Sequence, residues 1–93
     1  SVKMVSAVDV YHAEAGGEGS SMNTKAYTIL VSTDGEEFTE VVKVTKNMAG
    51  ETVDTFPVVN ARYVKLSVEK PTQGSDTAAR IYEVEVYGLD EAL

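Results

Sequence analysis

The sequence predicts an all-β protein, a single antiparallel β-sandwich domain spanning residues 1–93. Two observations predict this fold. Apolar and polar residues alternate with a period of two in several short segments, as they do in half-buried strands. Turn signals containing Gly, Asp or Asn separate these segments, and helical periodicity is almost absent. Short strands between such turns are typical of a sandwich.

Six segments carry the pattern of a strand: residues 2–12, 25–32, 38–45, 51–56, 62–69 and 80–87. Asp34 and Gly35 form the turn after the second segment, because Gly tolerates a positive φ and Asp can bond its own backbone. Pro57 cannot donate a ladder hydrogen bond, so it predicts a sheet edge or a strand end. The expected inward faces are Tyr27, Ile29 and Val31; Val64, Leu66 and Val68; and Tyr82, Val84 and Val86.

The composition excludes several classes of function. Fifteen acidic residues stand against eight basic ones, and the net charge is -7. The chain therefore repels phosphate backbones, and nucleic acid is not expected as a partner. The absence of cysteine excludes disulfides, thiolate catalysis and Cys-based zinc sites. No apolar run approaches the roughly 18 residues needed to cross a bilayer, so no membrane insertion is expected.

No constellation of residues indicates catalysis. His12 is the only histidine, and no Ser or Asp lies at a spacing that marks it as a catalytic partner. Glu83 and Glu85 lie two residues apart on one strand face, roughly 6.5–7 Å from each other. Two acids on one strand do not flank a substrate from opposite sides, so they are interpreted as a solvated face or a metal contact. The chain is therefore predicted not to be an enzyme.

Two long polar loops, residues 13–24 and 70–78, are the strongest functional signal. In an antiparallel sandwich both loops could end at the same pole. Amide and charged groups gathered there would suit sugar hydroxyls, which need paired donors and acceptors. The alternative is that these side chains are merely solvated. The candidate ligand-binding residues in or beside the loops are His12, Glu14, Asn23, Gln73, Asp76 and Arg80.

Three motifs occur in the order that is typical of one protein family. The first is YTILVSTDG at residues 27–35, followed by Phe38. The second is ARYVKL at residues 61–66, and the third is the alternating IYEVEVYG at residues 81–88. Over residues 27–88 the chain resembles the factor V/VIII type C, or discoidin-like, domain. This resemblance implies a jelly-roll β-sandwich of the galactose-binding-domain-like type.

The resemblance also implies a function. Many bacterial members of the family are carbohydrate-binding modules attached to glycoside hydrolases. Residues 10–27 are similar to the version appended to endo-N-acetylglucosaminidases and α-mannosidases. We therefore expect a secreted or cell-surface bacterial module that binds glycan and is joined to a hydrolase. The alternative is a structural or protein-interaction module that packs against a catalytic domain and binds no sugar.

A structural calcium ion is implied by the resemblance as well. In similar modules its ligands are an N-terminal loop, a Glu of the last strand and a neighbouring carbonyl. Glu83 matches this Glu, and the Tyr82 carbonyl lies beside it, whereas the other ligands have no counterpart here. Sugar contacts in such modules come from His, Arg, Asn and a loop aromatic. His12 matches the His, and no aromatic stands in residues 70–78.

Domains of this family are longer than this chain, and their N-terminal strands have no counterpart before Ser1. The chain is therefore expected to be the C-terminal two-thirds of the domain, a sandwich truncated at its N-terminus. An incomplete sheet exposes unpaired ladder groups that invite pairing with another chain. A homodimer through the incomplete sheet is expected on this ground.

Overall fold

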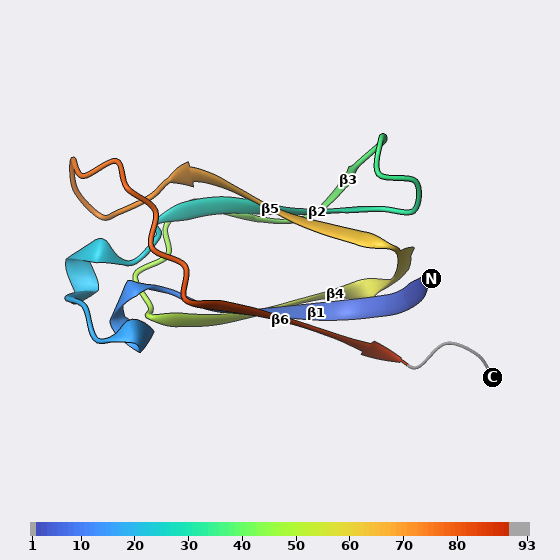
Figure 1. Cartoon of the computed structure of the whole chain (residues 1–93), viewed down its shortest axis with the longest axis horizontal. Helices are drawn as coiled ribbons and strands as arrows, with labels where there is room; N and C mark the ends of the chain where they lie inside the picture. Colours follow the sequence, from blue (N-terminus) through green and yellow to red (C-terminus); the bar gives the residue numbers. More distant parts are fainter. Residues whose placement is uncertain (1, 90–93) are drawn as a thin grey trace.

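The computed structural model describes residues 2–89 and consists of two stacked β-sheets (Figure 1). One sheet has the strand order β4–β1–β6, the other has the order β3–β2–β5, and the paired strands are antiparallel. The predicted all-β sandwich is confirmed. The elements are β1 (Lys3–Tyr11), the 3-10 helices η1 (Ala13–Gly16) and η2 (Ser20–Met22), β2 (Ala26–Ser32), β3 (Thr39–Val44), β4 (Glu51–Ala61), β5 (Tyr63–Lys70) and β6 (Glu83–Leu89).

The turn between β2 and β3 forms as the sequence predicts. Asp34 Oδ1 accepts the backbone N–H groups of Glu36 (2.8 Å) and Glu37 (3.0 Å). These two bonds are the main reason why the pKa of Asp34 lies below its usual value. Gly35 has a φ of 82°, a conformation that favours glycine. Asp34 is therefore a turn residue whose Oδ1 is bonded to the backbone.

The strand predicted for residues 51–56 is longer in the structure, because β4 continues through Pro57 to Ala61. β4 is an edge strand of its sheet, where a missing N–H donor is tolerated. The pairing with β1 also shifts register at this point, since Val5 pairs with Val59 and Ala7 with Thr55. The edge position predicted from Pro57 is confirmed.

The apolar core lies where β1 faces β2. Val8 and Val10 of β1 and Tyr27 and Ile29 of β2 are buried, and Val31 lies beside them. The predicted inward face of the second strand is therefore correct. Partly buried residues of β3 and β5 pack against the same core: Val41, Val42, Val44, Val64 and Leu66.

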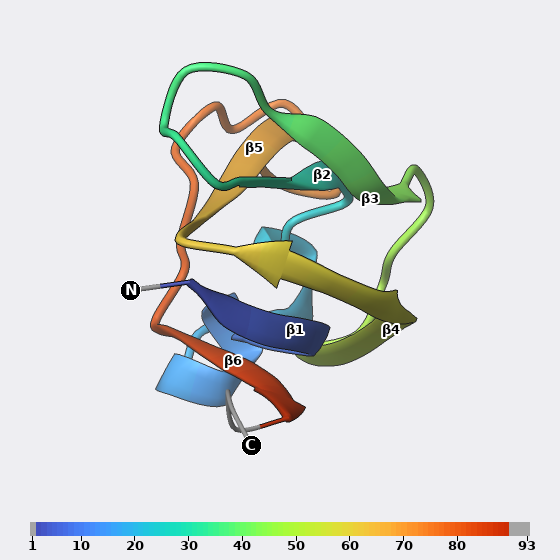
Figure 2. The same cartoon turned by 90° about the vertical axis from the view of Figure 1, so that its right-hand side faces the viewer.

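The burial predicted for the last strand is wrong. Val84 pairs with Val10 and Val86 with Val8, so both face the same way as the core valines. They are nevertheless 41% and 44% exposed, and Tyr82, which precedes β6, is 53% exposed. β5 and β6 are the edge strands on one side of the sandwich (Figure 2). We call this side the β5–β6 flank.

A chain of polar side chains extends the core toward one end of the sandwich. His12 Nε2 lies 2.9 Å from Thr52 Oγ1, and the Tyr27 hydroxyl lies 2.9 Å from Thr52 Oγ1 and 2.5 Å from Asp54 Oδ2. A phenol carries one proton and a carboxylate is the stronger acceptor, so Tyr27 donates to Asp54 and accepts from Thr52. Burial lowers the pKa of His12, which favours the neutral ring. Because Thr52 gives its one hydroxyl proton to Tyr27, its oxygen accepts from Nε2 of His12. The buried Nδ1 of His12 finds no partner within residues 2–89.

We expect Tyr27→Phe to lower the free energy of unfolding by about 1–3 kcal/mol, because Asp54 and Thr52 each lose a hydrogen-bond partner in a part-buried site. Urea denaturation followed by circular dichroism measures the change. Tyr63→Phe is the matched control, because its side chain is 46% exposed and its hydroxyl has no hydrogen-bond partner among the described residues. The control should change stability by less than about 0.5 kcal/mol. Equal losses of stability in the two variants would contradict the role of the Tyr27 hydroxyl in bonding Asp54 and Thr52.

Candidate functional site

The two long loops lie at the same end of the sandwich, opposite the β2–β3 turn (Figure 1). The first loop, residues 12–25, contains η1 and η2, and the second, residues 71–82, joins β5 to β6. The N–H of Gln73 donates to the carbonyl of Ser21 (3.0 Å), so the loops are in direct contact. The predicted common pole is confirmed. We call this end, which also includes residues 45–50, the loop pole.

Three amide side chains, Asn23, Asn47 and Gln73, hold the segments of the loop pole together. Asn47 Nδ2 donates to the Thr24 carbonyl (2.8 Å). Gln73 Nε2 donates to the carbonyls of Asn23 (2.9 Å) and Asn47 (3.0 Å). Asn23 Oδ1 accepts the N–H of Glu14 (2.9 Å). Asn23 and Asn47 are buried, so these bonds are shielded from water and fix the loops relative to one another. We call the three residues the amide network.

The six predicted contact residues fall into two groups. His12 and Asn23 have no exposed surface, so they support the loop pole from beneath. Their polar side chains already form hydrogen bonds with Thr52 and Glu14. Direct contact with a ligand would require the loops to open. The other four reach the surface, and their contact with sugar stays a prediction: Glu14, Gln73, Asp76 and Arg80.

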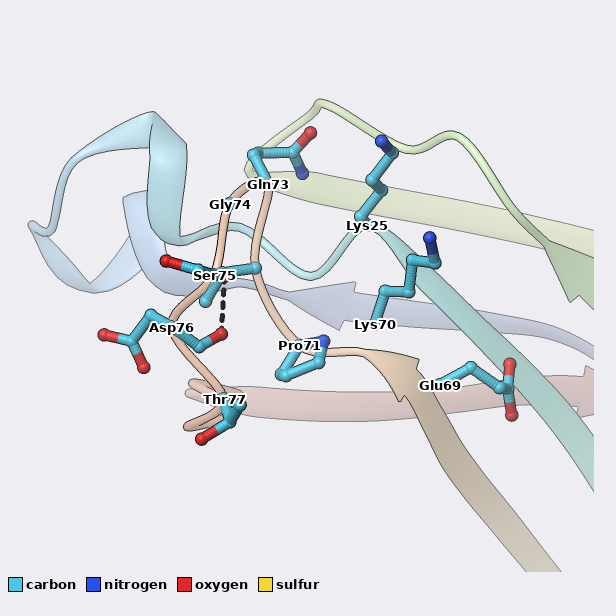
Figure 3. Close-up of a pocket in the computed structure, with 10 residues that line it drawn as sticks. Lys25, Glu69, Lys70, Pro71, Gln73, Gly74, Ser75, Asp76 and Thr77 are labelled. Carbon is cyan, nitrogen blue, oxygen red and sulfur yellow. Dashed lines mark hydrogen bonds between the residues drawn. The ribbon is translucent and has the colours of Figure 1, made fainter.

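Two adjoining hollows open beside the second loop. The smaller, of about 270 Å³, is lined by residues 69–77 together with Lys25 (Figure 3). The larger, of about 480 Å³, is lined by Lys25, Thr45, Lys46, Met48, Lys70 and Gln73. Lys25, Lys70 and Gln73 line both hollows, which therefore adjoin one another. No sequence motif singles out these lysines, because they belong to separate segments of the chain.

A cluster of charged side chains occupies the neighbouring surface. Arg80 lies 3.1 Å from a carboxylate oxygen of Glu18 and 3.1 Å from one of Asp76, and the Tyr82 hydroxyl donates to Glu18. The backbone N–H of Ala78 and then the Arg80 guanidinium lower the pKa of Asp76. Because these groups are partly exposed, their ion pairs add little to stability. They instead fix donors and acceptors at defined positions on the surface.

Tyr82 supplies an exposed aromatic ring at the loop pole. The alternating pattern predicts that Tyr82 lies inside the last strand, but in the structure it lies one residue before β6. Its ring lies so close to Gly16 that a Cβ there would come within 2.3 Å of it. Residues 70–78 contain no aromatic, as the sequence shows, but Tyr82, just beyond them, brings one to the loop pole. An exposed ring beside fixed donors and acceptors can contact both the C–H face and the hydroxyls of a sugar.

Glu83 and Glu85 lie on the outer face of the β4–β1–β6 sheet, as their spacing predicts. Glu83 pairs with Tyr11 and Glu85 with Asp9. A hydrogen bond with Glu85 and its charge raise the pKa of Glu83. The Tyr87 hydroxyl donates to Glu85 (2.6 Å), which raises the pKa of Tyr87 to about 12. All of these groups project from one side of one sheet, so they do not flank a substrate from opposite sides as glycosidase carboxylates do.

Glu83 and the Tyr82 carbonyl are also the calcium ligands implied by the family resemblance. Calcium takes roughly six to eight oxygen ligands. Within residues 2–89, no group of three or more acidic or imidazole side chains is arranged to hold a metal ion. These residues do not by themselves fit a calcium site. Calcium binding through Glu83 and Tyr82 stays a prediction from the resemblance.

A jelly-roll sandwich with its long loops gathered at one pole defines the discoidin-like class of module. The chain belongs to the F5/8 type C domain family, whose model matches residues 1–84. Among solved structures, it is similar to the family 32 carbohydrate-binding module of Streptococcus pneumoniae EndoD. The identity is 28% and the TM-score 0.87, over 96% of this chain and 64% of that chain.

A second similar structure is the CBM32-5 module of Clostridium perfringens, solved in complex with GalNAc-β-1,3-galactose. It is 19% identical with a TM-score of 0.76, over 95% of this chain and 60% of that chain, and it supports the fold alone. The chain thus spans less than two thirds of the length of either module. The comparison with curated proteins gives no match. None of the helices in the described range is long and apolar enough to span a membrane.

Proposed function

We propose that the chain is a non-catalytic carbohydrate-binding module that holds a secreted bacterial glycoside hydrolase on its glycan substrate. The observation that carries the proposal is the loop pole, where an aromatic ring, an ion-pair cluster and two adjoining hollows lie together. The 28% identity to the EndoD module supports it, because that protein is a carbohydrate-binding module. The parent hydrolase and the location outside the cell are parts of the proposal.

The geometry suits recognition of a sugar. The exposed face of Tyr82 offers an apolar surface for the C–H groups of a pyranose ring. Arg80, Asp76 and Glu18 are held by one another, so donors and acceptors stand ready for hydroxyl groups. Little entropy is lost in ordering side chains that are already fixed. The exposed area is small, so we expect weak binding at each site, as displaced water offsets much of the gain.

We expect sugar-dependent amide shifts near Tyr82 and Arg80 when the chain is titrated with a panel of neutral mono- and disaccharides, including GalNAc-β-1,3-galactose. Tyr82→Ala should raise the Kd by about five- to tenfold, equivalent to roughly 1–1.4 kcal/mol, because it removes the apolar platform. Tyr63→Ala is the control, because Tyr63 is similarly exposed and contacts Gly35 in the turn at the opposite end. Binding of no saccharide in the panel, or equal weakening by both variants, would contradict the proposal.

The β5–β6 flank favours a second candidate function, a module that packs against another protein surface. Val84 and Val86 face the interior yet remain exposed, and β5 and β6 both end their sheets. Unpaired edge strands beside exposed valines are suited to association with another chain. The occupant that we propose is a second copy of the chain, as a homodimer.

We expect the chain to show concentration-dependent dimerisation in sedimentation velocity. Val86→Lys should abolish it, because a charge would have to be buried against the partner's flank. Val53→Lys should leave it unchanged, because Val53 is exposed on the outer face of the edge strand β4. A wild-type chain that stays monomeric at the highest concentration would contradict the homodimer.

A further inference from the structure

The larger hollow at the loop pole is lined by positive charges, although the protein as a whole is acidic. Its lining includes three lysines, Lys25, Lys46 and Lys70, and no acidic residue. The whole chain, by contrast, has fifteen acidic residues and eight basic ones. Three of these eight positive charges therefore frame a single depression. We call it the lysine hollow.

Backbone hydrogen bonds bring the three lysines together from separate segments. The N–H of Lys25 donates to the carbonyl of Lys70 (2.9 Å), which joins the start of β2 to the end of β5. The N–H of Asn47 donates to the carbonyl of Lys25 (2.8 Å), which places the neighbouring Lys46 beside them. Asn47 is itself buried in the amide network. The clustering is therefore a property of the folded loop pole, built before any ligand arrives.

The charges of the lysine hollow are not neutralised within the protein. Two other cations have partners within the protein: Arg80 pairs with two carboxylates, and the Lys65 ammonium lies 5.0 Å from the centre of the Phe38 ring. Within residues 2–89, neither Lys25, Lys46 nor Lys70 makes an ion pair. Figure 3 shows the Lys25 and Lys70 side chains extending away from the second loop, on neighbouring segments of the chain. Such ammonium groups are available to an anion.

Two further groups in the hollow suit a sugar ring. Met48 is 76% exposed and offers apolar surface to C–H groups. Gln73 uses Nε2 for the carbonyls of Asn23 and Asn47, which leaves Oε1 to accept from a hydroxyl. The volume of about 480 Å³ lies in the range of small-molecule sites. The net charge of -7 disfavours polyanions with a phosphate backbone.

We infer that the lysine hollow binds a glycan unit that carries a negative charge, a carboxylate or a sulfate. The inference rests on the proposed function and assigns to the loop pole a second subsite, separate from the Tyr82 ring. The anionic group contacts the ammonium groups of Lys46 and Lys70, while the ring lies against Met48. The lysines contact only the charged group of the sugar. Their contribution therefore adds to the contact between Met48 and the ring.

The test compares sugars that share one ring: galactose, galacturonic acid and galactose 6-sulfate, titrated into the chain and followed by amide NMR. We expect at least one charged sugar to bind more tightly than galactose, with an advantage that shrinks as salt rises. Lys46→Gln should reduce that advantage by about three- to fivefold, as for a partly exposed ion pair. Lys43→Gln is the control with the same charge change, on the outer face of β3 opposite Thr28.

The possible outcomes distinguish failure of this inference from failure of the proposed function. A preference for galacturonic acid identifies a carboxylate ligand, a preference for the sulfate identifies a sulfated one, and either supports the inference. Equal binding of galactose and both charged sugars overturns the inference and leaves glycan binding intact. Equal effects of Lys46→Gln and Lys43→Gln also overturn it, since they indicate a long-range field. Binding of none of these sugars overturns the inference, and failure of the neutral panel as well overturns the proposed function.

Discussion

The loop pole depends on a small set of buried amide hydrogen bonds. The loops contain few bulky apolar residues, so hydrophobic packing cannot hold them in one conformation. Asn23, Asn47 and Gln73 instead join backbone carbonyls and amides of three separate segments. A buried amide that loses its partner costs about 1–3 kcal/mol, so the bonded arrangement is strongly favoured over alternatives. Every surface feature at this end, from the Tyr82 platform to the lysine hollow, rests on that arrangement.

The interior changes character along the sandwich. Near its middle the core is made of valine and isoleucine side chains from β1 and β2. Toward the loop pole it becomes polar, as His12, Thr52, Tyr27 and Asp54 form a connected chain. A polar interior is stable only when its members satisfy one another, and it then specifies one geometry more sharply than apolar packing does. The protein thus has an apolar core in its middle and a group of buried polar side chains beneath the loop pole.

Much of the fold could be predicted from the sequence, because strand periodicity and turn chemistry are local. Asp34 and Gly35 illustrate this, since both turn bonds and the positive φ involve residues within a few positions. The exposure of Val84 and Val86 could not be predicted, because alternation shows which way a side chain faces but not whether anything covers it. The start of the last strand could not be predicted either, because the alternating pattern includes Tyr82, which lies before the paired segment.

The site was harder to predict for the same reason. His12 and Asn23 are polar residues in or beside a glycine-rich loop, a pattern typical of the surface, yet tertiary contacts bury them completely. Lys25, Lys46 and Lys70 are spread over the chain, so only the fold reveals that they share one hollow. Gln73, Asp76 and Arg80 reach the surface, as expected of residues in or beside a long polar loop, and their contact with sugar stays a prediction.

The central claim is that the amide network fixes the loop pole, and amide hydrogen exchange of Asn47→Ala tests it most directly. The account predicts that exchange at the Lys25 N–H, which donates to Lys70, becomes roughly tenfold or more faster. Exchange in the middle of β2, at Ile29, should stay as in the wild type, and Asn60→Ala, at an exposed position of β4, should change neither. Unchanged protection of Lys25 in Asn47→Ala would contradict the account, because the loops would then hold their arrangement without the network.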